Sequence, residues 1–228
     1  MGRRPGGPDE PAMSRTRIKI CGLTREADVD DAVEAGADAI GLNLYARSPR
    51  GLSLERALAL AARLPPFVTP VLLFVNASPH EVRRAADSLP LALLQFHGDE
   101  TPEDCQASGR PWMRAARMQP GFDLLDFAAR YRGAQALLLD AHVEGFGGGG
   151  KVFDWSLIPP NVPAPLVLSG GLNPANVIDG VLRVRPWAVD VSSGVESGVP
   201  GQKGLKIAAL MRRFCDAVRE ADRLLGSR

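Results

Sequence analysis

Short runs of apolar, often β-branched residues alternate along the chain with longer stretches in which Ala and Leu are mixed with Glu and Arg. The short runs predict β-strands, and the longer stretches predict amphipathic helices. The predicted strands cover residues 17–21, 39–44, 71–75, 92–96, 112–116, 136–139, 166–168 and 188–191. The pattern is weakest over 112–116. We therefore expect eight strands in one repeating series.

Seven long helices are predicted between and after these strands. Four of them are expected over 26–35, 53–64, 122–131 and 206–225. The other three are expected to begin near Ser78, Thr101 and Asn173. Local signals mark some of their ends: Gly36 follows the first helix, and Ser78 with Pro79 supplies a hydroxyl cap and a first-turn proline. Only a weak crossover is predicted after the sixth strand.

Strands that alternate with helices require crossover connections and therefore a parallel sheet that is buried on both faces. Eight such units in 228 residues favour an α/β fold with a single (β/α)8 barrel. The alternative is an open doubly wound sheet, which normally carries a glycine-rich dinucleotide turn after its first strand; the turn at 21–24 does not match that pattern. The Gly- and Pro-rich residues 1–15 predict a flexible tail, and residues 16–228 one barrel domain.

The charge balance excludes several classes of partner. Lys and Arg number 27 against 26 Asp and Glu, so nucleic acid and anionic membranes are not expected as partners. No apolar run approaches the roughly 20 residues that span a bilayer. The three cysteines, Cys21, Cys105 and Cys215, are scattered and odd in number, which predicts a reducing, cytoplasmic location and no metal site.

In a barrel, functional residues lie at the carboxyl ends of the strands and in the loops that follow. The residues at these positions form an unusually polar and titratable set, which packing alone does not explain. The set comprises Cys21, Asn43, Asn76, His97, Arg114, Asp140, Ser169 and Ser192.

Cys21 and Asp140 are the two strand-end residues with the clearest chemical potential. Cys21 is either a small buried apolar residue or a nucleophile or base, since an ordinary thiol pKa of about 8.5 is close to neutral. Asp140 follows the apolar run 136–139, where a buried carboxylate is costly unless it has a partner or a task. A cap or turn aspartate is the other interpretation of Asp140.

Two glycine-containing segments predict a phosphate site. Ser169, Gly170 and Gly171 follow the seventh strand, and the segment from Asp190 through Ser192, Ser193 and Gly194 ends the eighth. Glycines let backbone N–H groups approach an anion closely, and barrels commonly bind phosphate after these two strands. The expected partner is therefore a small molecule that carries a phosphate group.

Three further features leave their roles open. Arg50, in the loop after the second strand, is either a bidentate carboxylate ligand or a solvated arginine. His97 is an acid, a base or a structural histidine. The segment 144–151 contains four consecutive glycines and predicts a mobile lid or an anion-contacting loop.

Six segments, in this order, resemble the phosphoribosylanthranilate isomerases of tryptophan biosynthesis. They are 19–24, 48–50, 95–100, 139–140 with 149–155, 168–174, and 189–196. The resemblance extends from Arg17 to the C-terminus and is specific because the six segments occur together. It implies a (β/α)8 barrel without metal or organic cofactor. The sequence does not distinguish a monomer from a homodimer.

The resemblance also implies a reaction and roles for particular residues. The reaction is an Amadori rearrangement of N-(5-phosphoribosyl)anthranilate, with Asp140 as general acid on the furanose oxygen and Cys21 as general base on C2. Arg50 corresponds to an arginine near the anthranilate. The remaining implied substrate-binding residues are His97, Ser169, Gly170, Gly171, Asp190, Ser192, Ser193 and Gly194.

The chain departs from the family pattern at three places. Asn43 and Ala46 stand where apolar and Pro- or Lys-like residues are expected, His142 lies near the acid, and 198–206 lacks an acidic residue. Two other functions stay open: a non-catalytic sugar-phosphate binder, and a ribotide isomerase that performs the same rearrangement. The second is expected to carry an aspartate where this chain has Cys21.

Overall fold

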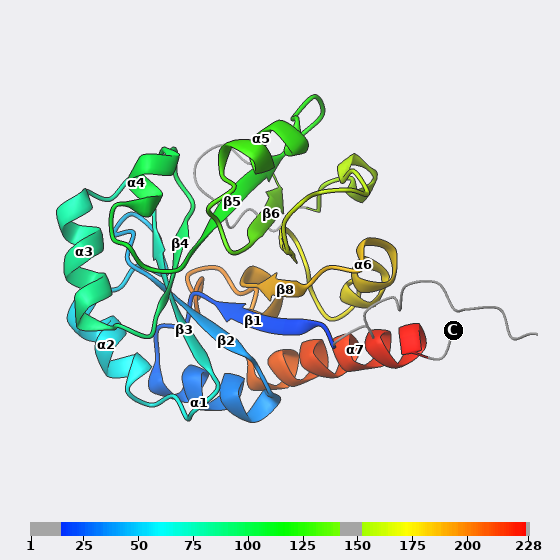
Figure 1. The fold of residues 1–228 in the computed structure, drawn as a ribbon. Coiled ribbons are helices and arrows are strands. Elements are labelled where there is room, and N and C mark those ends of the chain that lie inside the picture. The colour runs from blue at the N-terminus through cyan, green and yellow to red at the C-terminus, as the bar shows by residue number, and fades with distance from the viewer. Residues whose placement is uncertain (1–14, 142–151, 227–228) are drawn as a thin grey trace, which may run out of the picture.

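A computed structural model describes residues 15–141 and 152–226 of the chain. Eight parallel strands close into a barrel in the order β1 to β8, and helices surround it (Figure 1). The predicted (β/α)8 barrel is confirmed. Most of the predicted tail and the glycine-rich segment 144–151 lie outside the described residues, so both stay predictions.

The strands and helices alternate almost without exception. The strands are β1 (Arg17–Cys21), β2 (Ala39–Asn43), β3 (Thr69–Phe74), β4 (Leu93–Phe96), β5 (Trp112–Met118), β6 (Leu137–Ala141), β7 (Leu166–Leu168) and β8 (Ala188–Val191). The helices are α1 (Glu26–Ala35), α2 (Leu54–Ala61), α3 (Pro79–Ser88), α4 (Pro102–Gln106), α5 (Leu124–Arg130), α6 (Val177–Val184) and α7 (Ala208–Gly226).

Several boundaries differ from the prediction by a few residues, and three of these differences bear on the site. β5 is seven residues long, although its pattern is the weakest in the sequence. β6 extends to Ala141, so Asp140 lies within the strand rather than after it. α7 begins at Ala208 instead of Lys206, because Lys206 forms an antiparallel bridge with Glu196. The weak crossover after β6 is confirmed as the short 3-10 helix η1 (Trp155–Leu157).

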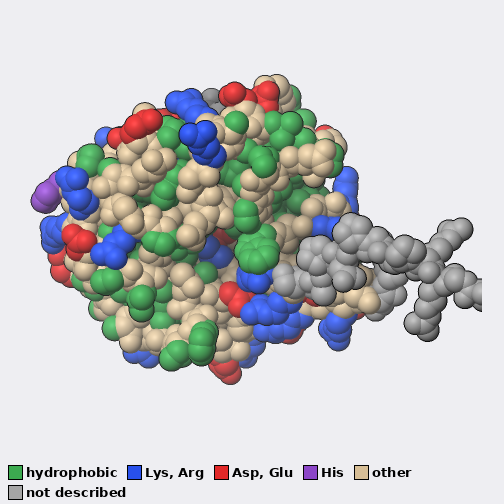
Figure 2. Space-filling view, in the orientation of Figure 1, with side chains coloured by type: hydrophobic (Ala, Val, Ile, Leu, Met, Phe, Trp, Pro, Cys, Tyr) green, Lys and Arg blue, Asp and Glu red, His purple; other side chains and the backbone are tan. Residues whose placement is uncertain are grey.

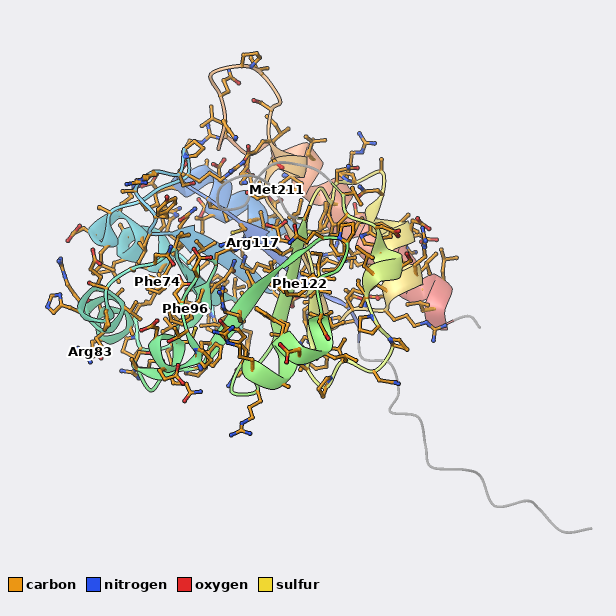
Figure 3. The ribbon with its side chains drawn as sticks, turned by 90° about the horizontal axis from the view of Figure 1, so that it is seen from above. Phe74, Arg83, Phe96, Arg117, Phe122 and Met211 are labelled. Atoms are coloured by element: carbon orange, nitrogen blue, oxygen red, sulfur yellow. The ribbon has the colours of Figure 1, made fainter. Side chains whose placement is uncertain are left out.

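Side chains alternate across each strand and build two apolar layers. The outward layer packs against the helices. It includes Phe74 of β3 and Phe96 of β4, whose rings stack with centroids 5.8 Å apart (Figure 3). The inward layer fills the lower part of the barrel with Val71, Met113, Ala115, Ala136, Leu138, Val167 and Ala188. These side chains form a packed apolar layer beneath the carboxyl ends of the strands.

α7 closes the outer ring of helices. It packs between α6 and α1 (Figure 1), and its residues Met211, Phe214 and Cys215 are fully buried. Lys and Arg side chains are interspersed with Asp and Glu on the face shown in Figure 2, as the near-zero net charge leads one to expect. No helix in the described ranges is both long and apolar enough to cross a bilayer.

Candidate active site

The carboxyl ends of the strands surround a cavity of about 460 Å³, a size typical of small-molecule sites. Ten of the eleven predicted site residues line it: Cys21, Arg50, His97, Asp140, Ser169, Gly170, Gly171, Asp190, Ser192 and Ser193. Gly194 does not. Thus the predicted site residues do come together at one cavity, although they lie far apart in the sequence.

Cys21 ends β1 with its side chain directed into the barrel. It pairs in register with Gly41 of β2, where an added Cβ would lie 2.5 Å from the Cys21 Sγ. Gly41 therefore leaves the space that the thiol occupies. Cys21 is only 6% exposed, yet it lines the cavity.

A buried ion pair lies beside the thiol. Lys19 precedes Cys21 by two residues and shares its inward face, and Lys19 Nζ donates to Asp190 Oδ1 at 2.7 Å. Burial raises the pKa of the Cys21 thiol, and the neighbouring Lys19 ammonium acts in the opposite direction. Burial likewise disfavours the charged form of Lys19, but Asp190 and Cys21 outweigh it, and the pKa of Lys19 is raised. Lys19 therefore stays charged and favours the thiolate.

Asp140 reaches the same cavity from β6, a strand separated from β1 by β7 and β8 on one side and by β2–β5 on the other. Its Oδ1 accepts a hydrogen bond from the backbone N–H of Ala141 at 2.9 Å. Its Oδ2 lies 3.2 Å from His97 Nε2, and His97 Nδ1 lies 3.0 Å from Gln95 Nε2. Asp140 is therefore held by a chain of contacts from β4, and His97 contacts this carboxyl directly.

The turn after β7 contains two glycines in backbone conformations that other residues rarely adopt. Gly170 and Gly171 adopt left-handed φ angles of 78° and 67°. A Cβ at Gly170 would lie 2.6 Å from the Ala141 backbone nitrogen, so only glycine fits there. Ser169 Oγ donates to Asp190 Oδ2 at 3.3 Å. The Asp190 carboxylate, predicted as a substrate ligand, is thus already bound by Lys19 and Ser169.

Gly194 has a packing role that its sequence position does not reveal. It lies in η2 (Ser193–Val195), and a Cβ there would lie 1.9 Å from the Leu172 carbonyl oxygen. Gly194 is absent from the residues that line the cavity, so its predicted contact with the substrate stays a prediction. Its lack of a side chain instead allows the β7 and β8 turns to approach each other.

Gly194→Ala should therefore separate the two turns. We expect a loss of about 1–3 kcal/mol in stability, as for overpacking in a core, and a KM increased by about tenfold or more. Thermal unfolding and steady-state kinetics measure these effects. Gly226→Ala is the matched control, because a Cβ at Gly226 meets no atom within 4 Å; equal effects of the two substitutions would contradict the packing role.

Arg50 binds a carboxylate bidentately, but that carboxylate belongs to the protein. Its Nε and Nη2 donate to Glu196 Oε1 and Oε2 at 2.7 and 2.9 Å, and Lys206 Nζ donates to Oε1 at 2.9 Å. Burial disfavours the Glu196 carboxylate, yet Arg50 and Lys206 outweigh burial and lower its pKa to about 2. Of the Arg50 nitrogens, Nη1 has no partner among the described residues.

This ion pair predicts a loss of stability in acid. The pKa of Glu196 falls from 4.5 to about 2 on folding, which corresponds to about 3 kcal/mol of stability. Because the folded-state pKa is lowered, this stability is present above pH 4.5 and is lost as the pH falls toward 2. Denaturant unfolding of Glu196→Gln should show a weaker pH dependence than wild type in this window. Glu34→Gln, at a side chain 70% exposed, should retain the wild-type dependence.

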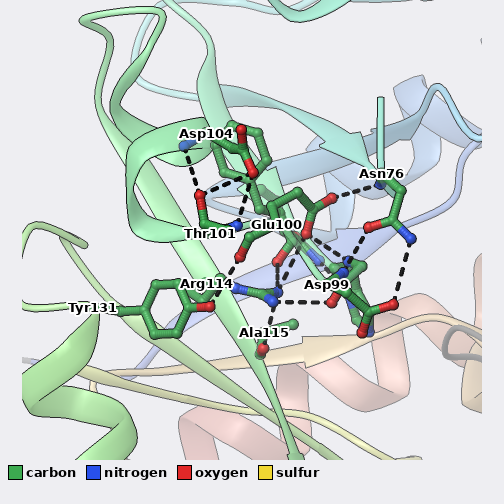
Figure 4. Close-up of polar contacts among 12 residues, drawn as sticks. Asn76, Asp99, Glu100, Thr101, Asp104, Arg114, Ala115 and Tyr131 are labelled. Atoms are coloured by element: carbon green, nitrogen blue, oxygen red, sulfur yellow. Dashed lines mark hydrogen bonds and ion pairs between the residues drawn. The ribbon is translucent and has the colours of Figure 1, made fainter. Parts of the chain in front are cut away.

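Two of the predicted strand-end residues, Asn76 and Arg114, do not line the cavity. β5 continues to Met118, so Arg114 is a mid-strand residue in register with Phe96 and Leu137 of the outward layer. Figure 4 shows it beside Glu100, which accepts hydrogen bonds from the backbone nitrogens of Asn76 and Gly98. Arg114 donates to the Phe96 and Gly98 carbonyls. This network supports the loop that carries His97.

Among the residues with no predicted role, Lys19, Gln95 and Lys206 belong to the site or its support. Lys19 and Gln95 each stand two residues before a site residue, so their side chains lie on the same face of the strand. A polar residue at such a position on a buried strand could have been identified from the sequence. Lys206 carries no such signal. Cys105 and Cys215 are fully buried, as predicted for packing residues. The described residues contain no cluster that could hold a metal ion.

The chain is similar to one family throughout nearly all of the barrel. A family model described as N-(5'phosphoribosyl)anthranilate (PRA) isomerase matches residues 18–217. A protein from Leptothrix cholodnii named N-(5'-phosphoribosyl)anthranilate isomerase is 74% identical over 209 residues, which cover 92% of this chain and 93% of that protein.

Solved structures agree with this similarity. A phosphoribosyl anthranilate isomerase in complex with reduced 1-(o-carboxyphenylamino)-1-deoxyribulose 5-phosphate has a TM-score of 0.79 and 38% identity, covering 90% of this chain and 99% of that one. A second structure, of monomers generated from the dimeric Thermotoga maritima enzyme, has a TM-score of 0.76, 36% identity and the same coverage.

Proposed function

The chain belongs to the N-(5'-phosphoribosyl)anthranilate isomerase family, and we propose that Cys21 is the general base and Asp140 the general acid of its reaction. The enzyme converts N-(5-phospho-β-D-ribosyl)anthranilate to 1-(2-carboxyphenylamino)-1-deoxy-D-ribulose 5-phosphate, an Amadori rearrangement in tryptophan biosynthesis. One observation carries the assignment: a thiol and a carboxyl from separated strands line the same cavity as the two glycine turns.

The first step assigned to the protein is opening of the furanose ring. Asp140, carrying a proton, donates it to the ring oxygen as the bond from that oxygen to C1 breaks. The anthranilate nitrogen supplies the electron pair, and a Schiff base forms. The contacts of Asp140 with Ala141 N–H and His97 support this role, since they hold the carboxyl in place at the cavity that would bind the sugar.

The second step is removal of the proton from C2. The Cys21 thiolate takes this proton, and the electron pair left behind forms an enolamine that tautomerises to the ketone. A thiolate is required, and the charged Lys19 beside Cys21 favours it. The order of the steps suits the arrangement, because the acid and the base reach the sugar from different sides of the barrel mouth.

The two glycine turns would hold the phosphate. Gly170, Gly171 and Ser193 line the cavity, and the two glycines carry no side chain that would keep an anion away from the backbone N–H groups. Asp190 next to them is paired with Lys19, which reduces its repulsion of a phosphate. Anchoring the phosphate would fix the position of C2 relative to the thiol.

Arg50 and the loop after β2 would bind the anthranilate. Tyr45, Arg47 and Arg50 line the cavity there, and Glu196 fixes the Arg50 guanidinium in place. Arg50 Nη1 is the nitrogen that is left to donate to the anthranilate carboxylate. Glu196 therefore sets the direction from which Arg50 reaches the substrate.

The loss of substrate fluorescence in the presence of the purified protein tests the proposal, with freshly prepared N-(5-phosphoribosyl)anthranilate. Turnover that depends on both Cys21 and Asp140 supports the assignment. Thermal stabilisation by the substrate without turnover would instead indicate a non-catalytic sugar-phosphate binder.

The phosphosugar substrate is the expected partner of the protein. Whether the chain also binds a second copy of itself is a separate question. The Thermotoga maritima relative is described as dimeric, which favours the homodimer over the monomer for this chain. Light scattering after gel filtration distinguishes a 24.3-kDa monomer from a particle of twice that mass.

A further inference from the structure

Gln95 lies in the centre of the barrel with a side chain that the proposed chemistry does not use. It is fully buried on β4, two residues before His97 and on the same inward face. Gln95 Nε2 lies 3.0 Å from His97 Nδ1. Gln95 Oε1 has no hydrogen-bond partner among the described residues. A buried amide with one unpaired end requires an explanation.

The orientation of this amide determines the tautomer of His97. If the amide nitrogen faces the ring, it donates to Nδ1, and the ring proton must lie on Nε2. If the amide oxygen faces the ring, the proton lies on Nδ1, and the amide is left with two unpaired buried N–H donors. Unpaired buried carbonyls are less rare than unpaired buried N–H groups. The first orientation is therefore the stable one.

We propose that Gln95 is a positioning residue that holds His97 in the Nε2–H tautomer, so that the imidazole donates a hydrogen bond to Asp140 Oδ2. The inference rests on the proposed role of Asp140 as the general acid. The two contacts, 3.0 Å from Gln95 to His97 and 3.2 Å from His97 to Asp140, connect the barrel interior to the acid.

The tautomer of His97 matters because it determines the hydrogen bond that Asp140 receives while Asp140 gives up its proton. An N–H at Nε2 donates to Asp140 in both protonation states, and the bond strengthens as negative charge develops on the carboxyl. The opposite tautomer presents a lone pair to Asp140 and binds well only to a carboxyl that keeps its proton. That proton would then be directed to His97 instead of the sugar. Gln95 acts through His97 on the acid, so its loss is expected to change kcat more than KM.

The tautomer can be observed directly in the wild-type protein. Long-range ¹H–¹⁵N spectra of histidine-labelled protein distinguish the two ring nitrogens, and the sequence has only three histidines to assign. Loss of one set of signals in His97→Asn identifies His97. We expect a protonated Nε2 and an unprotonated Nδ1; the reverse pattern would overturn the inference without any variant of Gln95.

Substitutions of Gln95 test the consequence for catalysis. Gln95→Met removes the amide at similar volume, and Gln95→Glu offers His97 Nδ1 an acceptor in place of a donor. We expect both to change the His97 signals and to lower kcat about 10- to 100-fold, with KM changed less than about threefold. Met113→Leu is the control, because Met113 is the inward-facing neighbour of Gln95 on β5 and does not line the cavity.

The possible outcomes separate this inference from the proposed function. Wild-type kcat in both Gln95 variants would refute the role of Gln95, even if Asp140→Asn is inactive. Wild-type kcat in Asp140→Asn would refute the proposed acid itself. Thermal unfolding of each variant identifies any loss of kcat that comes from misfolding, and the wild-type tautomer tests the inference if neither Gln95 variant folds.

Discussion

Replacing Cys21 with alanine is expected to lower kcat by about 10²- to 10⁴-fold, because it removes the base that takes the proton from C2. This corresponds to about 3–5 kcal/mol of activation free energy. Cys21→Ser should lose nearly as much, since a hydroxyl of similar size ionises far less readily than a thiol. Steady-state kinetics with the fluorescent substrate measure both effects.

The pH dependence supplies a second test of the same residue. Burial raises the pKa of the Cys21 thiol, so the thiolate fraction and kcat/KM should both increase as the pH rises through neutrality. This increase should be absent from the residual activity of Cys21→Ala. Cys105→Ala is the matched control, because Cys105 is buried in α4 away from the cavity. Unchanged kcat in Cys21→Ala would remove the thiol from the mechanism.

Asp140→Asn is expected to lower kcat about 10²- to 10⁴-fold with little change in substrate affinity. An asparagine oxygen can still accept one of the hydrogen bonds that Asp140 accepts, from Ala141 N–H or from His97, but the amide has no acidic proton for the ring oxygen. The loss should therefore fall on the chemical step.

Binding of a stable ligand separates the two contributions. The reduced product, 1-(o-carboxyphenylamino)-1-deoxyribulose 5-phosphate, is bound by a related isomerase and is suitable for calorimetry. Asp140→Asn should bind it with a Kd within about threefold of wild type. A large loss of affinity without loss of kcat would indicate a binding residue rather than an acid. Asp179→Asn, at an exposed position on α6, serves as control.

The architecture was accessible from the sequence because strand and helix periods alternate eight times. The register was harder to predict, and β5 shows why. Arg114 weakens the apolar pattern, yet its guanidinium is buried against Glu100 and backbone carbonyls, so a charged residue occupies an outward-layer position. Sequence patterns do not show such a partner, which explains why the expectation that Arg114 ends the strand is wrong.

The sequence indicates which residues line the site better than it indicates what each of them does. Cys21 and Asp140 stand near strand ends, where barrels concentrate their chemistry. The partner of Arg50 is Glu196, which lies 146 residues away in the chain, and no local pattern indicates that pairing. Gln95 was detectable by its phase with His97, but its contact with the imidazole nitrogen is a property of the folded barrel.

The distribution of the three cysteines has a practical consequence for chemical biology. Cys105 and Cys215 are enclosed by apolar side chains, whereas Cys21 lines the cavity. An electrophile attached to a phosphate-bearing scaffold would therefore meet a single sulfur, at the position where the sugar is processed. Such a reagent would inactivate the enzyme stoichiometrically and report the concentration of competent sites in a preparation by mass spectrometry.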